Sequence, residues 1–213
     1  MKITSRNEEN ITIMGVDSST TGVAWTLIKI VDGSPVPVEW GKIKLDGKKE
    51  MMDKMGLVAE HFTPLVYHHQ PDHIFIEKSI FVKNPDTARK LSFVVGALMV
   101  IAAQQDKPVM LVEPASWKAF TKYRNLTRKM VDSAVSKLGK TEGKKFCDKL
   151  RKVQTSRVLQ HCYPSWTIDY SDHDIVDSCG VALYGVNQLC MEINLEIPPF
   201  GLLSQEELDI VGS

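Results

Sequence analysis

Four acidic residues on separate segments of the chain have the type and placement to bind metal ions. Asp17 ends the apolar run ITIMGVD, Glu77 ends the run HIFIE, and Asp174 and Asp177 open the segment DIVDSCGVALYG. Carboxylates at the ends of buried elements are costly unless they are paired, solvated or bound to a cation. Hard oxygen ligands suit Mg²⁺ or Mn²⁺, and paired ions of this kind cut phosphodiesters by in-line displacement. These carboxylates therefore predict a metal-dependent nuclease.

The spacing of Asp174 and Asp177 supports a shared role. On a helix, residues three apart lie on one face, with Cβ atoms about 5–6 Å apart, so both side chains can reach one site. The alternative is helix capping, because acids near a helix N-terminus complement its dipole. Asp172 is already a cap candidate, and two further acids at strand ends also weaken that alternative.

Asp17 and Glu77 are expected at one edge of a sheet. If their strands are neighbours, both carboxylates emerge beyond the carboxyl ends of those strands, where open α/β sheets place their sites. The alternative for Glu77 is a surface ion pair with Lys78. Adjacent side chains on a strand point to opposite faces, which argues against that pair.

Length and composition fit one soluble globular domain, which we expect to span residues 1–213. The chain is 43% apolar and 24% charged, both ordinary values. It starts with the polar run MKITSRNEEN, which is no secretion signal. The longest nearly apolar run, residues 91–103, is shorter than the roughly 20 residues that a membrane span needs. We therefore expect a protein of the cytoplasm of a bacterial or phage-infected cell, not a secreted one.

The four cysteines form no CxxC pair, and reduced thiols are the expectation without a secretory context. Cys147, His161 and Cys162 are possible zinc ligands by residue type. Their spacing matches no common zinc template, so zinc is not expected.

Charge is distributed unevenly although the net charge is zero. Residues 115–160 hold 13 basic and 3 acidic residues, whereas residues 165–213 hold nine acidic residues and no Lys or Arg. A run of lysines is often only a solvated helix face. Beside a carboxylate cluster, it indicates a surface that binds anions such as nucleic acid.

The pattern of apolar residues predicts an α/β fold. We expect a five-stranded mixed sheet, with three antiparallel strands followed by two parallel ones, flanked by helices. The expected strands are residues 11–17, 22–30, 36–45, 72–77 and 108–113. The expected helices are residues 50–69, 85–105, a short helix after Pro114, 125–138 capped by Thr127, and about 174–193. The Lys-rich residues 139–163 are predicted to be an inserted, mobile helical loop, and residues 194–213 a C-terminal tail.

Three stretches together resemble one family. GVDSSTTGVAW, then IFIEKSIFVKNPDTARKLSFVVGALMVIAAQQDKPVMLVEPASWK, then DIVDSCGVALYG resemble the RuvC-type Holliday junction resolvases of the RNase H-like superfamily, in a divergent form like those of phages and other viruses. The resemblance covers most of residues 11–138 and 172–190. It implies that Asp17, Glu77, Asp174 and Asp177 bind two Mg²⁺ ions, for which Mn²⁺ substitutes.

The resemblance also implies roles for other residues. Lys118 and Lys129 match the lysines that the family uses in catalysis, next to scissile and neighbouring phosphates. The expected DNA-binding residues are Lys83, Asn84, Lys118, Lys122, Arg128 and Lys129. The family's aromatic wedge falls on Ile80, with Phe81 one residue later.

The implied activity is a Mg²⁺-dependent endonuclease that resolves Holliday junctions, or other branched DNA such as forks and flaps, by symmetric nicking that leaves 5′-phosphates. The near two-fold symmetry of a junction favours a homodimer, and the apolar segment at residues 91–103 is either part of its interface or plain core. One alternative is a non-catalytic protein that binds branched DNA. Another is a phosphotransferase, because GVDSSTTGVAW also looks like the phosphate-binding turn of sugar kinases and actin-like ATPases. Those proteins need a duplicated second domain, and no such repeat is found here.

Overall fold

The structure is a computed structural model that describes residues 11–78, 84–197 and 202–212. The chain divides into two compact units. The first contains residues 11–117 and 166–193, and the second contains the described residues from 118–165 and from 194 onward. The predicted partition into one domain, with an insertion at 139–163 and a tail at 194–213, stays a prediction.

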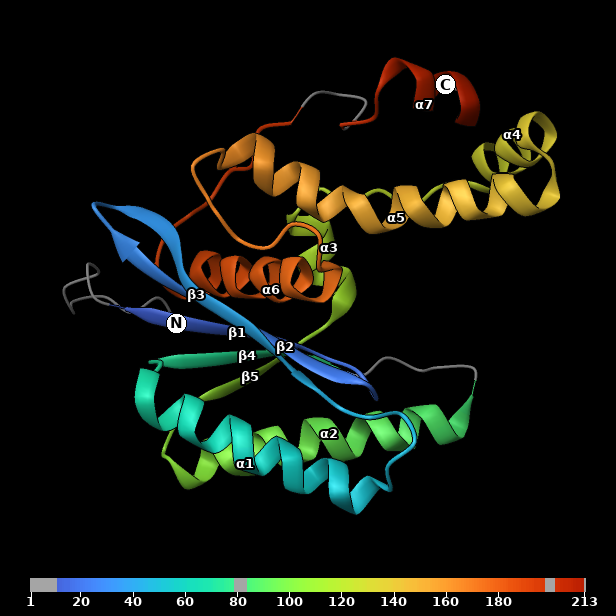
Figure 1. The fold of residues 1–213 in the computed structure, drawn as a ribbon. Helices are drawn as coiled ribbons and strands as arrows, with labels where there is room; N and C mark the ends of the chain where they lie inside the picture. The colour runs from blue at the N-terminus through green and yellow to red at the C-terminus, as the bar shows by residue number, and fades with distance from the viewer. Residues whose placement is uncertain (1–10, 79–83, 198–201, 213) are drawn as a thin grey trace. The chain divides into compact units, whose positions relative to one another are not determined.

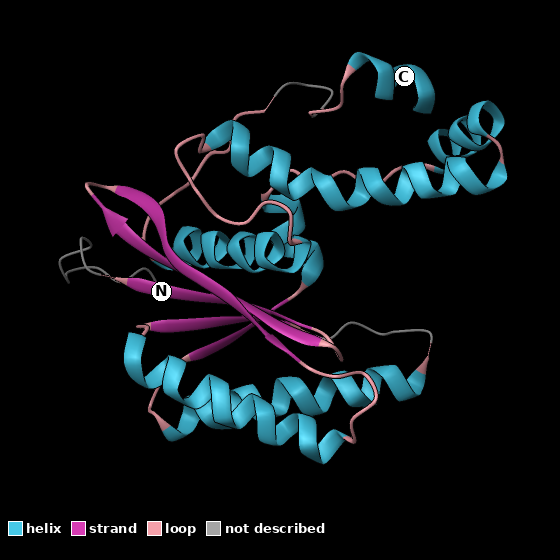
Figure 2. Cartoon of the chain, viewed as in Figure 1, coloured by secondary structure: helices cyan, strands magenta, loops and turns pink. Residues whose placement is uncertain are grey.

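A five-stranded sheet forms the centre of the first unit (Figures 1 and 2). Its strand order is β3-β2-β1-β4-β5. The first three strands form an antiparallel meander, and β4 and β5 run parallel to β1, which confirms the predicted mixed sheet. The strands are β1 (Thr12–Ser18), β2 (Gly22–Val31), β3 (Ser34–Lys44), β4 (His73–Glu77) and β5 (Val109–Val112).

Local turn chemistry sets the meander. In the SSTTG turn, the Ser19 amide donates to the Gly22 carbonyl at 2.8 Å. Between β2 and β3, Asp32 and Gly33 take φ values of 50° and 71°. Positive φ at both central residues is the conformation that a two-residue hairpin needs, and Asp-Gly adopts it readily. The Asp-Gly turn therefore joins β2 to β3 where the sequence predicts a turn.

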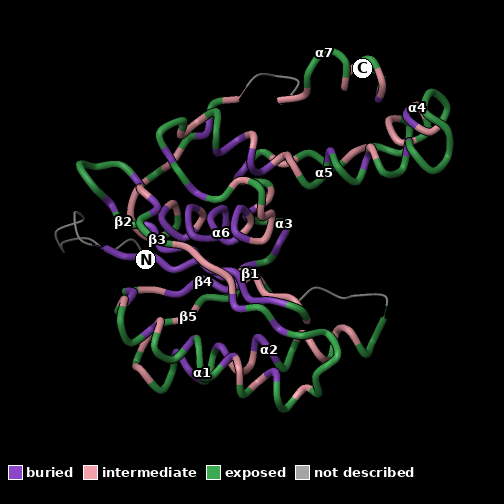
Figure 3. The backbone as a smooth tube through the Cα atoms, viewed as in Figure 1, coloured by how far each residue is buried: buried purple, intermediate pink, exposed green. Residues whose placement is uncertain are grey.

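Helices cover both faces of this sheet. The helices α1 (Met51–His69) and α2 (Pro85–Gln104) pack on one face, and α6 (His173–Leu189) packs on the other (Figure 1). Val16 and Ile76 belong to the core beneath α1 and α2. Because side chains alternate along a strand, the residues next to them in sequence face α6. Figure 3 shows α6 as largely buried, and the strands β1 and β2 are buried over most of their length, whereas β3 and β5 are mostly exposed or intermediate.

The helix α6 lies directly on the backbone of β1. A Cβ atom at Gly15 would sit 2.3 Å from the Ser178 carbonyl oxygen, and one at Gly185 would sit 2.9 Å from Ile13 Cγ2. Only glycine permits so close an approach. Since residue 178 lies over residue 15 and residue 185 over residue 13, α6 runs antiparallel to β1 and begins at its carboxyl end.

The second unit is helical. The helices α4 (Arg128–Leu138) and α5 (Lys140–Cys162) cross closely, because a Cβ atom at Gly143 would sit only 2.6 Å from Val135 Cα. The helix α7 (Gln205–Val211) is attached through Arg157, whose guanidinium donates to both carboxylate oxygens of Glu207 at 2.6 and 2.7 Å. The short helix α3 (Pro114–Phe120) contains the boundary between the units.

Three sequence-based expectations need correction. The segment predicted as a mobile helical loop at 139–163 is helical, but it forms one continuous helix, α5, which buries residues at helical spacing such as Cys147 and Leu150. The last predicted helix ends at Leu189 rather than near residue 193, and the tail contains α7, capped by Ser204. The Thr127 cap is confirmed, because its side chain accepts from the Met130 amide at 3.3 Å. Within the described ranges, no helix has the length and apolar character that crossing a membrane requires.

Candidate active site

Asp17 and Glu77 occupy matched positions on neighbouring parallel strands. Val16 of β1 is the register partner of Ile76 of β4, and each acid is the next residue along its strand. Since Val16 and Ile76 face the core under α1 and α2, Asp17 and Glu77 lie on the opposite face, which α6 covers. The expectation that their strands are neighbours is therefore confirmed.

The first turns of α6 supply the other two acids. The N-cap of α6 is Asp172, whose carboxylate accepts from the Asp174 amide at 3.0 Å. Asp172 therefore supplies the side-chain cap of α6, and helix capping does not explain the presence of Asp174 and Asp177. Because α6 begins at the carboxyl end of β1, its first turns start on the side of the sheet toward which Asp17 and Glu77 lie. The assignment of Asp174 and Asp177 to a shared site with them stays a prediction.

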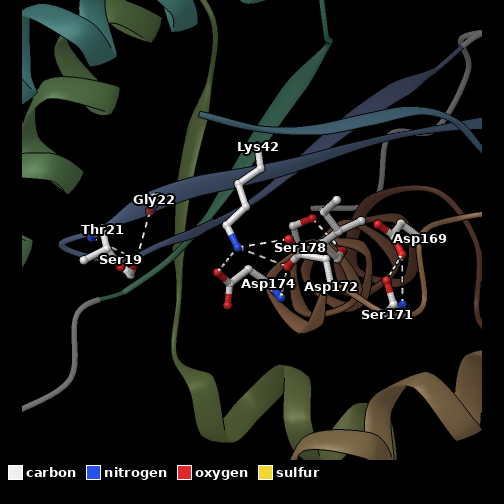
Figure 4. A network of polar contacts seen from close by, with 10 residues as sticks. Ser19, Thr21, Gly22, Lys42, Asp169, Ser171, Asp172, Asp174 and Ser178 are labelled. Atoms are coloured by element: carbon white, nitrogen blue, oxygen red, sulfur yellow. Dashed lines mark hydrogen bonds and ion pairs between the residues drawn. The ribbon is translucent and has the colours of Figure 1, made fainter. Parts of the chain in front are cut away.

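A lysine that the sequence analysis missed reaches this edge from β3 (Figure 4). The Nζ of Lys42 lies 2.6 Å from Asp174 Oδ2 and 3.0 Å from Asp172 Oδ2. Burial lowers the pKa of Lys42, but the hydrogen bonds and charges of Asp174 and Asp172 outweigh burial and raise it. Burial likewise raises the pKa of Asp172, and its bonds to Lys42 and to the Asp174 amide bring it below the ordinary value. Lys42 is therefore a charged partner of α6.

Glu77 has a buried partner on α3. The Trp117 Nε1–H donates to Glu77 Oε2 at 2.5 Å, and Trp117 is fully buried. Lys78, the ion-pair partner weighed for Glu77, donates to Glu113 at 2.6 Å. Trp117 stands in the quoted EPASWK stretch, but nothing in the sequence assigns it to Glu77. The indole fixes one carboxylate oxygen of a candidate ligand.

The donor set fits a divalent cation by residue type. All four candidates are carboxylates, the ligands that Mg²⁺ and Mn²⁺ prefer, and their elements converge on one sheet edge. In the described part of the chain, no three His, Cys, Asp or Glu side chains form a group that could hold a metal. Asp174 is engaged by Lys42, and Glu77 is engaged by Trp117.

The other predicted residues fall in different parts of the chain. Asn84 is the N-cap of α2 and accepts from the Asp86 amide at 3.0 Å. Lys83 and both wedge candidates, Ile80 and Phe81, lie outside the described residues. The remaining basic candidates, Lys118, Lys122, Arg128 and Lys129, belong to the second unit. The Lys118 ammonium lies 5.7 Å from the Tyr123 ring centroid. The DNA-binding roles of all these residues stay predictions.

The sequence matches one family model and also matches individual members of that family. Residues 13–146 match the sequence model of the family described as crossover junction endodeoxyribonuclease RuvC. The RuvC of Chlamydia trachomatis serovar L2 is 30% identical over 128 residues, which are 59% of this chain and 75% of that protein. The RuvC of Oleidesulfovibrio alaskensis is 26% identical over 110 residues, 52% of this chain and 66% of the relative.

Solved structures share the fold. The RuvC of Thermus thermophilus in complex with a Holliday junction substrate superimposes with a TM-score of 0.53 at 15% identity, covering 82% of this chain and 91% of that one. The fowlpox virus resolvase with Holliday junction DNA gives 0.51 at 15% identity, covering 84% and 98%.

The fold and the acid-bearing edge define the RNase H-like class that the sequence predicts. With the family match, which spans well over half of the chain, the protein belongs to the RuvC family of crossover junction endodeoxyribonucleases, as a divergent member. The matched range includes Asp17, Glu77, Lys118 and Lys129 and ends before α6. The assignment of the α6 acids therefore depends on how α6 packs.

Proposed function

We propose that this chain is a divalent-metal-dependent endonuclease that resolves four-way DNA junctions by symmetric nicking. One observation carries the proposal: Asp17 and Glu77 end register-matched strands on the face where α6 begins. The two neighbouring structures contain junction DNA, which supports branched DNA as the substrate. Acting on such DNA, the protein would work in the cytoplasm of a bacterial or phage-infected cell.

Asp17, Glu77, Asp174 and Asp177 would hold two Mg²⁺ ions, with Mn²⁺ as a substitute. Such ions, when bound, lower the pKa of an attacking water and stabilise the leaving oxygen. The contribution of the chain is to mount four hard-oxygen ligands on two strands and a helix, which are rigid supports. We expect products with 5′-phosphates and ligatable nicks.

Basic side chains would hold the DNA. Lys118 and Lys129 are proposed to bind the scissile and neighbouring phosphates, where lysine acts as a compact point charge. The concentration of positive charge over residues 115–160 supports this role, because phosphate contacts supply most of the affinity for nucleic acid. Lys83, Asn84, Lys122 and Arg128 are proposed as further contacts, and Ile80 or Phe81 as the wedge.

A homodimer is part of the proposal. The helix α2 exposes Phe93 and Val100 by 51% and 57%, and the edge strand β5 exposes Leu111 by 42%. Large exposed apolar side chains on adjoining elements are typical of a protein interface. A C₂ dimer presents two sites to two strands of a nearly symmetric junction. Light scattering should therefore find a dimer that Val100→Glu dissociates.

The decisive experiment is a cleavage assay with Mg²⁺ or Mn²⁺. It compares a synthetic four-way junction, a three-way fork and a linear duplex, with Asp174→Asn as the inactive control. Paired symmetric nicks in the junction, absent in the variant, support resolution of junctions. Preferential cutting of the fork keeps the nuclease and changes its substrate. Tight junction binding without cutting by the wild type would indicate a non-catalytic binding protein instead.

A further inference from the structure

Lys42 forms an ion pair with Asp174, a candidate metal ligand. A metal ion that binds Asp174 would therefore compete with Lys42 for this carboxylate. We infer that Lys42 is a tethered cation that occupies Asp174 until a divalent ion displaces it, and so sets the metal concentration that the site requires. The inference rests on the proposed function. It makes Lys42 a positioning residue, because it acts on the reaction through Asp174.

The position of Lys42 is built into the sheet. Lys42 is the register partner of Ala24 on β2. Ala24 is two residues from Thr26, which bonds to α6, so Ala24 and Lys42 lie on the face of the sheet that α6 covers. Its stem passes over Gly22, where a Cβ atom would sit 3.2 Å from Lys42 Cε. Small residues on β2 thus leave a path along which the lysine reaches α6. The side chain is 23% exposed, so its ammonium is partly withdrawn from water.

The two carboxylates that hold Lys42 have different tasks. Asp172 accepts through both oxygens, at 3.0 and 3.1 Å, and also caps α6. Asp172 is not among the four candidate ligands. Asp174 is a candidate ligand and is more exposed than Asp172. When Asp174 turns to a metal ion, Lys42 therefore keeps a partner, and no buried charge is left alone.

The effect of Lys42 on stability and on metal affinity follows from the balance of charges around Asp174. Without metal, the neighbouring carboxylates of Asp172 and Asp174 repel one another, and the Lys42 ammonium, which bonds to both, offsets that repulsion. With metal, the same ammonium opposes the incoming positive charge. Lys42 should therefore stabilise the metal-free protein and weaken the apparent affinity for the ion.

The test is direct Mn²⁺ binding to the full chain after removal of metal with a chelator. Loss of the free-ion magnetic resonance signal gives the half-saturating concentration, and thermal unfolding gives the stability of the metal-free protein. In Lys42→Met we expect a lower unfolding temperature and a half-saturating concentration reduced roughly fivefold, which corresponds to about 1 kcal/mol. Lys44→Met is the matched control, because it removes the same charge two residues along the same strand.

The outcomes separate the inference from the proposed function. An unchanged or raised half-saturating concentration in Lys42→Met overturns the inference, as does an equal reduction in Lys44→Met. If Lys42→Met fails to fold, Lys42→Gln repeats the neutralisation with a side chain that still donates a hydrogen bond. A wild-type protein that neither binds Mn²⁺ nor cuts DNA overturns the proposed metal site as well, whereas one that binds and cuts leaves only the role of Lys42 to be judged.

Discussion

Thr26 of β2 and Ser178 of α6 share a buried hydrogen bond across the sheet–helix interface. Their hydroxyl oxygens lie 2.7 Å apart, and both residues are fully buried. Thr26 is the register partner of Gly15, the residue on which the α6 backbone rests. Because Ser178 directly follows Asp177, this hydrogen bond fixes α6 against the sheet next to that acid. The positions of Asp174 and Asp177 therefore depend on the Thr26–Ser178 pair.

Breaking this pair should destabilise the protein. Thr26→Val keeps the shape of the side chain and removes its hydroxyl, while Ser178 keeps its bond to the Ile175 carbonyl at 2.8 Å. We expect Thr26→Val and Ser178→Ala each to lower the free energy of unfolding by about 1–2 kcal/mol. The double variant should lose less than the sum, because the two share one bond. Urea denaturation measures all three, and strict additivity would contradict a shared bond.

Gly15→Ala should displace α6. The added Cβ would meet the Ser178 oxygen and the Ala182 nitrogen, each at 2.3 Å, and backbone atoms cannot move aside. We expect a loss of about 3 kcal/mol or more in stability, with junction cleavage falling further as the α6 acids shift. Gly56→Ala in α1 is the control, since its Cβ would have no neighbour within 4 Å. Thermal unfolding should show that control stabilised by up to about 1 kcal/mol.

Trp117→Phe should slow cleavage without weakening junction binding. The substitution removes the donor that holds Glu77 and retains most of the buried ring. Partners of metal-binding side chains contribute about 10–100-fold to activity or metal affinity, and we expect a loss in the lower part of that range. Single-turnover cleavage measures it. Trp166→Phe, which removes a bond to the Pro35 carbonyl instead, should change stability alone; an equal loss of rate in both variants would argue against a specific role for Trp117.

Lys118→Ala should reduce the salt dependence of junction binding. A lysine on a phosphate releases a counterion, so its loss lowers the slope of log K against log salt by about 1. Titrations at several salt concentrations give the slope. Lys29→Ala, an exposed lysine on β2, is the comparison and should leave the slope unchanged. If Lys118→Ala leaves it unchanged too, Lys118 does not contact a phosphate of the junction.

Acid should release α7 from the second unit. The hydrogen bond from Arg157 lowers the pKa of Glu207, outweighing burial, which raises it. A carboxyl with a lowered folded pKa stabilises the protein above its unfolded pKa, near 4.3, and loses that contribution as the pH falls through the folded value. The protection of residues 205–211 against hydrogen exchange, taken relative to the intrinsic rate at each pH, should therefore fall below about pH 4. In Glu207→Gln this protection should be low at every pH, while Glu206→Gln should follow the wild type.

Much of the first unit could be predicted because its signals are local. Buried strands appear as apolar runs, and the Asp-Gly turn fixes where β2 and β3 pair. Asp17 and Glu77 could be assigned to one edge once their strands were taken as neighbours. The helix α5 shows the opposite case, because few large apolar residues in a lysine-rich segment gave a weak pattern, although those few lie at helical spacing.

The sequence by itself determined which acidic residues are available to bind metal and which strands carry them at their ends. Short stretches of chain are enough for this, because a strand and its last residues are specified locally. Only the tertiary structure decided which groups those acids meet. Lys42 and Asp172 are 130 residues apart, and Trp117 and Glu77 are 40 apart. Such pairs form where the sheet order and the contact at Gly15 bring distant segments together, since ion pairs and hydrogen bonds act only over a few ångströms.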